Sequence, residues 1–211
     1  MTLPTLNQRR SWTLDDTAAA SNPGNLLVDR LVWVRHYPMW PLTWGLGLLA
    51  LLLLGWVIHW SLWIAAIFLL AINVWYWVRV QEHFSRGCAN PSVVVGLEPM
   101  LVAVSTDLTK GYGEYPAVKI VPVRLTTAAG KTPKVGSRLA AVALYYADVD
   151  TSVPHWTDFD PRPVDCATSD IEQIERVMNT FTDADWDELE TLVKNVPTPY
   201  RPGLYCLWGT A

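Results

Sequence analysis

The feature that most constrains this chain is an uncharged run of 38 residues, from Pro41 to Val78, in which most side chains are apolar. As one straight helix this run would extend about 57 Å, nearly twice the ~30 Å thickness of a bilayer's hydrocarbon core. A single straight span therefore cannot keep the whole run in lipid. The chain has to turn within it, or leave the membrane partway along.

The stretch WVIHWSLW around His59 predicts that the chain turns. A split at His59 and Trp60 leaves two arms of about 17 and 18 residues, each near the shortest length that crosses a bilayer. Ser61 can cap the second helix, and Gly55 can loosen the end of the first. We therefore predict a transmembrane helical hairpin over 40–80. The alternative is one tilted span continued by a helix packed on protein, which would leave His59 and Ser61 in mid-bilayer without partners.

The tryptophans support the hairpin, since eight of the twelve fall between positions 33 and 77. Indole is most favourable at the membrane–water interface, so tryptophans mark the ends of spans. One group begins the first arm, a second lies at the turn and a third ends the second arm, which describes a path out and back. The predicted membrane-interface anchors are Trp33, Trp40, Trp44, Trp56, Trp60, Trp63, Trp75 and Trp77.

The flanking charges predict the orientation of the hairpin. Arg30 and Arg35 precede the apolar run, and Arg79 and Arg86 follow it, with no Lys or Arg between. By the positive-inside rule both ends of the hairpin lie in the cytoplasm and the turn lies outside. We expect the two termini to share the cytoplasmic compartment.

The segment before the hairpin divides into two parts. Residues 1–24 are polar and rich in turn formers, and we predict a flexible N-terminal arm. Residues 25–37 predict a short interfacial amphipathic helix, because Leu27 and Leu31 fall on one helical face. This helix either lies on the inner leaflet, with Trp33 at headgroup level, or packs on the protein's own soluble part; the pattern leaves both open.

From residue 88 to residue 211 the composition predicts a small cytoplasmic α+β domain. The segments PSVVVGL, MLVAVS, AVKIVPVRL and RLAAVALYYADV are short, rich in β-branched residues and separated by turn signals. They predict an antiparallel sheet or partial barrel. A proline-rich crossing, VPHWTDFDPRPVDC, follows. Two C-terminal helices come next: one opens on a Ser169–Glu172 capping box and the other on Thr182 or Asp183. The tail PYRPGLYCLW is predicted to be extended and able to rejoin the sheet.

Charge is distributed unevenly over this domain. Residues 87–147 hold six Lys or Arg and three Asp or Glu, whereas residues 148–190 hold thirteen Asp or Glu and two Arg. The basic half can face anionic headgroups while the acidic half faces the cytosol, although a solvated surface without an oriented role explains the same pattern. The net charge of −4 argues against a nucleic-acid partner. Three cysteines without metal-like spacing predict reduced thiols rather than disulfides.

The candidate catalytic stretch contains His155, Asp158 and Asp160, followed by Asp165 and Cys166. Imidazole with nearby carboxylates is a ligand set for divalent metals. The H-x-x-D-x-D spacing on a proline-rich loop matches neither zinc nor EF-hand patterns, and aspartates beside prolines commonly form turns. We therefore predict no metal site here and keep the loop as a weak candidate site.

Two polar residues of the hairpin are further candidates. His59, among tryptophans near the outer interface, is a candidate ligand for a pigment or a haem, but interfacial polar residues need no cofactor and we predict none. Asn73 is the most deeply placed polar group of the second arm and can bond to the first arm or to another subunit. Because the arms contain no charged side chain, we do not expect transport by this chain alone.

The C-terminal stretch, from NPSVVVGLEPMLVAVSTDLTKGYGEYPAVKIVPV through HWTDFDPRPVDCATSD to YRPGLY, resembles an uncharacterised bacterial family. Its members are two-span membrane proteins with a C-terminal cytoplasmic domain of unknown function. The likeness covers roughly residues 88–205. It implies a bacterial origin, and hence the inner membrane, but it carries over no functional residue.

Together these features predict a non-catalytic membrane protein. We interpret it as an accessory or assembly subunit whose hairpin packs against a larger bacterial membrane complex, with a cytoplasmic interaction domain. The expected partners are the lipid bilayer and other membrane-protein subunits, and not nucleic acid. The alternative is a membrane-tethered enzyme or ligand-binding domain that uses the loop from His155 to Asp165.

Overall fold

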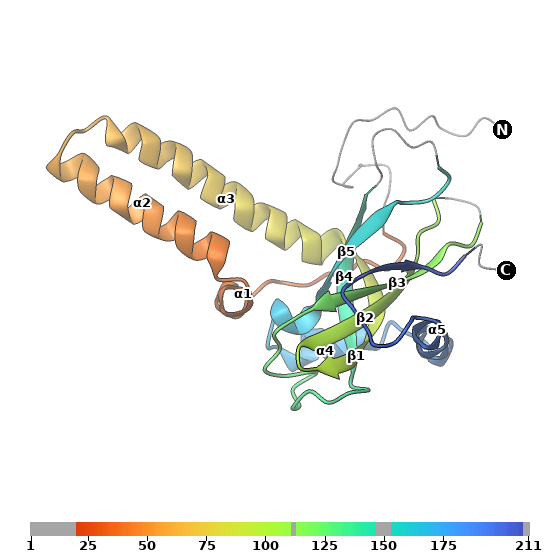
Figure 1. Ribbon diagram of the computed structural model, residues 1–211. Coiled ribbons are helices and arrows are strands. Elements are labelled where there is room, and N and C mark those ends of the chain that lie inside the picture. The colour runs from red at the N-terminus through yellow and green to blue at the C-terminus, as the bar shows by residue number, and fades with distance from the viewer. Residues whose placement is uncertain (1–19, 111–112, 147–152, 209–211) are drawn as a thin grey trace.

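The computed structural model describes residues 20–110, 113–146 and 153–208. Two long helices form a hairpin that projects from a curved sheet with helices around it (Figure 1). This architecture confirms the predicted fold class of a helical hairpin joined to an α+β domain. The part of the N-terminal arm at residues 1–19 lies outside the described residues.

The hairpin consists of α2 (Met39–Val57) and α3 (Leu62–Arg86). Both helices are long and apolar enough to cross a membrane, and only 6% and 11% of their most apolar windows are buried inside the molecule. The chain reverses between them, as the His59–Trp60 split predicts. Ser61 precedes α3, but its hydroxyl lies 2.8 Å from His59 Nδ1 and caps no helix amide.

All neighbouring strands of the sheet are antiparallel, in the order β5-β4-β1-β2-β3-β6. The strands are β1 (Cys88–Leu97), β2 (Met100–Asp107), β3 (Pro116–Pro122), β4 (Arg138–Tyr146), β5 (Asp158–Pro163) and β6 (Gly203–Cys206). Three strands separate β3 from β5 in this order, yet Lys119 of β3 reaches Asp158 of β5 at 2.8 Å. The sheet is therefore curled into a half-barrel, and the tail rejoins it as predicted.

The proline-rich crossing contains an edge strand, so the prediction of a loop there was wrong. Strand β5 pairs with β4 over its whole length, and Phe159, Pro161 and Pro163 alternate towards the buried side. Proline cannot donate to a strand ladder, but it is accommodated on an edge strand whose other side has no partner strand. The alternation of buried residues shows why the segment pairs despite its prolines.

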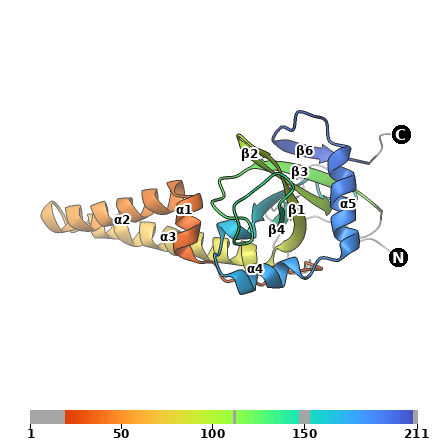
Figure 2. The same ribbon diagram turned by 90° about the horizontal axis from the view of Figure 1, so that it is seen from below.

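Apolar side chains fill both faces of the sheet. Val102, Val104, Leu139 and Phe159 belong to the cluster inside the curl. On the outer face, Trp186 of α5 (Asp183–Lys194) belongs to the cluster that covers β2 and β3. Figure 2 shows α5 along this side of the sheet.

A third cluster joins the sheet to the membrane helices. It combines Phe84 of α3, Val142 of β4 and Ile174 of α4 (Ile171–Met178), together with Val164 of the short 3₁₀ turn η1 (Val164–Cys166). Burial of apolar area stabilises such a contact by roughly 25 cal/mol per Å². The domain end of α3 is therefore part of the core of the sheet domain.

The helix caps agree with the predicted boundaries except in one detail. Thr182 and Asp185 form a capping box at the start of α5. At α4, however, the cap is Asp170, whose Oδ1 accepts from the amides of Glu172 and Gln173. The predicted Ser169–Glu172 box is therefore replaced by an aspartate cap one residue later, which satisfies the same free amides.

The segment before α1 differs from its prediction. Residues 20–24 do not behave as a free arm, because Asn22 O accepts from the amide of Ala89 at 2.7 Å and the Gly24 amide donates to Gly87 O at 3.0 Å. The helix predicted over 25–37 is shorter, since α1 (Arg30–His36) begins after the N-cap Asp29.

Candidate functional site

The tip of the hairpin carries outward-facing tryptophans. Trp56 and Trp60 are 81% and 66% exposed, and Trp63 donates its indole N–H to Leu52 O at 3.3 Å. His59 lies in the same turn, with its Nδ1 engaged by Ser61. The tip therefore presents the indole surface expected of a membrane interface, while the expectation that His59 binds no pigment or haem stays a prediction.

The opposite end of the hairpin brings the other two tryptophan groups to one level. Trp40 and Trp44 of α2 have ring centroids 6.1 Å apart, and Trp44 stacks on Tyr76 of α3 at 6.4 Å. Tyr76 lies between Trp75 and Trp77 in the sequence. The start of α2 thus lies beside the end of the apolar part of α3, which is the arrangement that the order of tryptophan groups predicts.

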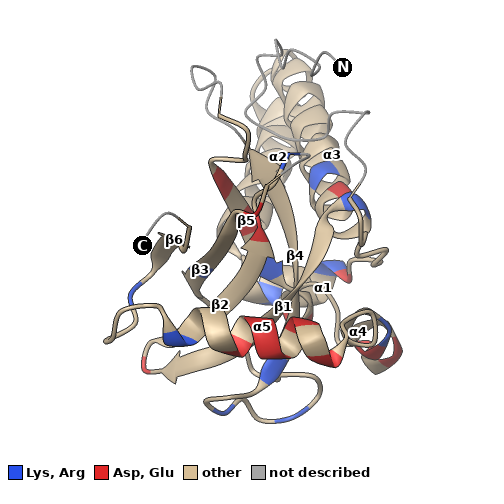
Figure 3. Cartoon of the chain, turned by 90° about the vertical axis from the view of Figure 1, so that its right-hand side faces the viewer, with Lys and Arg blue, Asp and Glu red and all other residues tan. Residues whose placement is uncertain are grey.

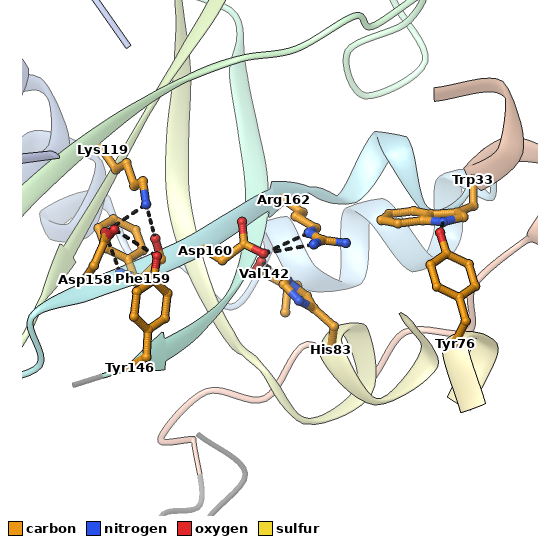
Figure 4. Close-up of polar contacts among 10 residues, drawn as sticks. All are labelled: Trp33, Tyr76, His83, Lys119, Val142, Tyr146, Asp158, Phe159, Asp160 and Arg162. Carbon is orange, nitrogen blue, oxygen red and sulfur yellow. Dashed lines mark hydrogen bonds and ion pairs between the residues drawn. The ribbon is translucent and has the colours of Figure 1, made fainter. Parts of the chain in front are cut away.

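Trp33 does not belong to these interface groups, so its prediction as a headgroup anchor was wrong. Its side chain is 1% exposed and its indole N–H donates to Tyr76 Oη at 2.7 Å (Figure 4). The inner face of α1 therefore packs on the protein, while Leu27 and Leu31 on the outer side are 72% and 73% exposed. Burial of Trp33 and exposure of the leucines give this segment a protein face and an apolar outer face.

Helix α3 runs without interruption from the apolar span into the core of the sheet domain. Val80, His83 and Phe84 near its end are buried. His83 Nε2 lies 2.9 Å from Val142 O, a carbonyl of β4, and since a carbonyl accepts, this nitrogen carries the proton (Figure 4). The buried side chains of α3 and the bond from His83 to the β4 backbone therefore fix the sheet domain to the end of the apolar span.

The polar face of β5 supports this junction. Arg162 donates to Asp160 Oδ2 through Nη2 at 2.9 Å and through Nε at 3.1 Å. Its guanidinium lies 5.2 Å from the ring of Trp33 (Figure 4). It also lies 5.8 Å from the ring of Tyr37. Asp160 therefore orients an arginine over two aromatic rings, a cation–π contact that holds α1 against the sheet.

Asp158 closes the curl of the sheet. Lys119 Nζ donates to Asp158 Oδ1 at 2.8 Å and to Phe159 O at 2.6 Å, and Tyr146 Oη donates to Asp158 Oδ2 at 2.8 Å (Figure 4). Both oxygens of this carboxylate are hydrogen-bonded within the protein. The ammonium of Lys119 joins strands that are not neighbours in the sheet.

His155 stands apart from both aspartates. Its Nδ1 lies 2.8 Å from Trp156 O, and its ring packs between Tyr115 at 4.7 Å and Trp208 at 5.0 Å. The predicted site residues His155, Asp158 and Asp160 are thus engaged in three separate contacts and do not converge. In the described part of the chain, no group of three His, Cys, Asp or Glu side chains is placed to hold a metal ion.

Asp165 and Cys166 are buried in η1, directly after strand β5. Asp165 Oδ1 accepts from the Ala129 amide at 2.7 Å, whereas Oδ2 has no hydrogen-bond partner within the described residues. Burial raises the pKa of the Asp165 carboxyl to about 6 and the pKa of the Cys166 thiol to about 12. A thiol with that pKa stays protonated at neutral pH, so the burial of Cys166 does not favour a nucleophile.

Asn73 forms no hydrogen bond to α2 among the described residues. Its side chain instead lines a cleft between α3 and the segment that leads into α1, together with Arg30, Trp77 and Gln81. Sequence reasoning found Asn73 but not this cleft, because the cleft depends on how residues 26–30 fold back along α3. The signal available in the sequence was Arg30, a basic residue that precedes the apolar run.

Acidic residues gather on the two C-terminal helices. Figure 3 shows the positions of Asp and Glu, in red, along α5 and at α4. The exposed members, which we call the acidic face, are Glu172, Glu175, Asp183, Asp187 and Glu188. Glu190 of α5 lies outside this set because it pairs with Arg138 at 2.9 Å. The uneven charge of the sequence thus becomes a surface formed by two helices.

Comparisons with known proteins agree with the resemblance seen in the sequence. The DUF3239 model, described as a protein of unknown function, matches residues 77–196. No curated protein matches the chain. A chain from Corynebacterium diphtheriae, described as a "putative membrane protein", is similar at 21% identity with a TM-score of 0.48, covering 56% of this chain and 99% of that one.

Proposed function

Because the chain belongs to the DUF3239 family of proteins of unknown function, we propose a role from its geometry. The chain is a non-catalytic membrane protein whose hairpin crosses the bacterial inner membrane twice. It acts as an accessory or assembly subunit of a larger membrane complex. Its sheet domain lies in the cytoplasm and presents the acidic face to a partner.

The observation that carries this proposal is the continuity of α3. One helix contributes unburied apolar turns to the hairpin and then the buried Val80, His83 and Phe84 to the domain core. A flexible linker would let the domain move freely, whereas a continuous helix fixes its distance and rotation relative to the bilayer. A fixed domain suits a protein that positions a binding surface near the membrane.

The contacts of the candidate loop support the non-catalytic reading over the enzyme alternative. Asp158 is bonded by Lys119 and Tyr146, and Asp160 by Arg162. A general base or metal ligand needs a lone pair directed at substrate or metal. Both oxygens of Asp158 and Oδ2 of Asp160 instead accept from groups that hold the sheet and α1 together.

The acidic face supports a basic or mixed-charge protein partner. Arg176 is the basic residue of α4, and its guanidinium donates to Asn25 O at 2.6 Å, so it is turned towards the chain's own N-terminal segment. A surface of one charge sign accelerates encounter with a partner of the opposite sign and excludes partners of like charge.

Co-purification of the full chain from membranes in mild detergent tests the proposal. We expect other membrane proteins to co-purify with it, and the yield to fall when Glu172, Glu175, Asp187 and Glu188 are changed to the corresponding amides. As a control, Glu98→Gln with Glu114→Gln removes two exposed acidic charges elsewhere on the domain and should leave the yield unchanged; the acidic-face pair Asp187→Asn with Glu188→Gln, which removes the same number, should lower it. A chain that always purifies alone as a monomer would contradict the subunit role.

A further inference from the structure

A cleft of about 530 Å³ lies beside the domain end of the apolar span. One wall is α3, with Asn73, Trp77 and Gln81. The other is formed by Val28, in the segment before α1, and by Arg30, the first residue of α1. The Val28 amide donates to Gln81 Oε1 at 3.1 Å, and Gln81 Nε2 donates to Leu26 O at 2.7 Å. These two bonds hold the walls together at a fixed position.

The cleft contains an arginine without an acidic partner. The guanidinium of Arg30 lies 5.5 Å from the ring centroid of Trp77, and no carboxylate forms an ion pair with it among the described residues. Glu82 also lines the cleft, but it accepts from Arg79 at 2.7 Å and from Arg86 at 3.2 Å. The charge of Glu82 is therefore compensated, and that of Arg30 is not.

The α3 wall of the cleft combines apolar and polar side chains. Val74 and Val78 line it and are each 55% exposed, and they share the wall with Trp77 and the polar Gln81. The amide of Asn73 lies on the same wall and forms no hydrogen bond within the described residues. An amphiphile with one anionic group and an apolar chain matches this combination, whereas a free anion leaves the apolar part unused.

We propose that this cleft binds one phospholipid of the leaflet next to the sheet domain. The Arg30 guanidinium donates to the phosphodiester oxygens in a bidentate pair, the geometry in which arginine binds phosphate most favourably. The Asn73 amide donates to a glycerol ester carbonyl, and an acyl chain follows Val74 and Val78. The inference rests on the proposed membrane role, since it needs α3 to cross the bilayer.

The position of Arg30 gives this contact its strength. A guanidinium at the boundary of the hydrocarbon is less screened than one in bulk water, and an anionic lipid is present there at high local concentration. Trp77 holds the guanidinium on one side by a cation–π contact, which reduces the conformational entropy that the Arg30 side chain loses when it binds phosphate. The anionic lipid phosphatidylglycerol is therefore the appropriate probe.

Native mass spectrometry of the full chain, delipidated in detergent and titrated with phosphatidylglycerol, tests the proposal. We expect one tightly held lipid and a loss of affinity of about fivefold in Arg30→Gln, the effect of one basic residue near an anionic surface. Asn73→Leu should also weaken binding. Arg35→Gln is the matched control, because it removes the same charge from an exposed position of α1 outside the cleft.

The outcomes separate this inference from the proposed function. Equal affinities of the Arg30→Gln and Arg35→Gln variants for phosphatidylglycerol would show that the lipid is held by general charge. That result would overturn the proposed lipid site in the cleft. Displacement of the lipid by inorganic phosphate at equal concentration would assign the site to free anion instead. Extraction of the wild-type chain from membranes by alkaline carbonate would reject the membrane role itself, whereas carbonate resistance with no Arg30 effect rejects only the lipid site.

Discussion

Asp165 carries a carboxylate in the interior of the sheet domain, with 4% of the residue exposed. One oxygen accepts from Ala129, and the other has no partner among the described residues. Desolvation is the largest effect on this group and raises its pKa from 3.8 to about 6, against the lowering effects of its backbone hydrogen bonds and of His36. The charged form is therefore disfavoured by the fold.

This burial predicts a pH dependence of stability. The folded chain binds the Asp165 proton more tightly than the unfolded chain, so the stabilisation is complete below pH 4 and is lost as pH rises through about 6. We expect this group to reduce the unfolding free energy by about 2 kcal/mol between pH 4 and pH 7. Asp165→Asn should remove that part of the slope in chemical unfolding followed by circular dichroism.

The control for this measurement is Asp187→Asn, which neutralises an exposed carboxylate of α5. It should keep the wild-type slope between pH 4 and pH 7. If Asp165→Asn and the wild type lose stability in parallel over this interval, the burial of Asp165 does not control the pH dependence.

At the scale of the elements, the contact between α2 and α3 depends on one close approach near the turn. An added Cβ at Gly55 would meet Trp63 Cδ1 at 2.0 Å and Nε1 at 2.4 Å. Gly45, ten residues earlier in the same helix, has nothing within 4 Å of the same position. The two glycines therefore differ in whether the opposite helix leaves room for a side chain.

We expect Gly55→Ala to displace the Trp63 ring and to break its bond to Leu52 O, which lowers hairpin stability by about 1 kcal/mol. Gly45→Ala should be neutral or stabilising, because alanine favours the helix over glycine. Thermal unfolding of the two variants in the same detergent measures the difference. A melting temperature of Gly55→Ala at or above that of Gly45→Ala would contradict this packing.

Strand β5 is an element that the sequence pattern alone did not predict. Pro161 and Pro163 are signals against a strand in the sequence, and only the free side of an edge strand makes them acceptable. The segment at 88–97 and the three strands that follow it were predictable because β-branched residues and turn signals do not depend on which neighbour pairs with which. Edge position is a property of the whole sheet.

At the scale of the whole molecule, the hairpin and the curled sheet are joined through α3 and α1. The two ends of the hairpin lie on the side of the sheet domain, and the turn lies at the far end (Figure 1). Arg30 and Arg86 both lie near the junction, while the turn region contains no Lys or Arg. This distribution favours a cytoplasmic sheet domain and an outer turn.

Reporter fusions test this topology directly. A reporter that is active only in the cytoplasm should work when fused before Met1 and when fused after Ala211, and it should fail when inserted after Trp60. As a control, a reporter that is active only outside the cytoplasm should give the reverse pattern. Opposite locations for the two termini would exclude a two-span path.

The sequence by itself determined the hairpin, the outer tryptophan groups, strands β1 to β4 and helices α4 and α5, because these follow from local hydrophobicity, length and capping. It did not determine the environment of Trp33, the separate contacts of His155, Asp158 and Asp160, or the cleft at Arg30. Each of these depends on which distant segments meet: Trp33 with Tyr76, Asp158 with Lys119, Val28 with Gln81. Burial and hydrogen-bond partners belong to pairs of residues far apart in the chain, so only the tertiary structure decided them.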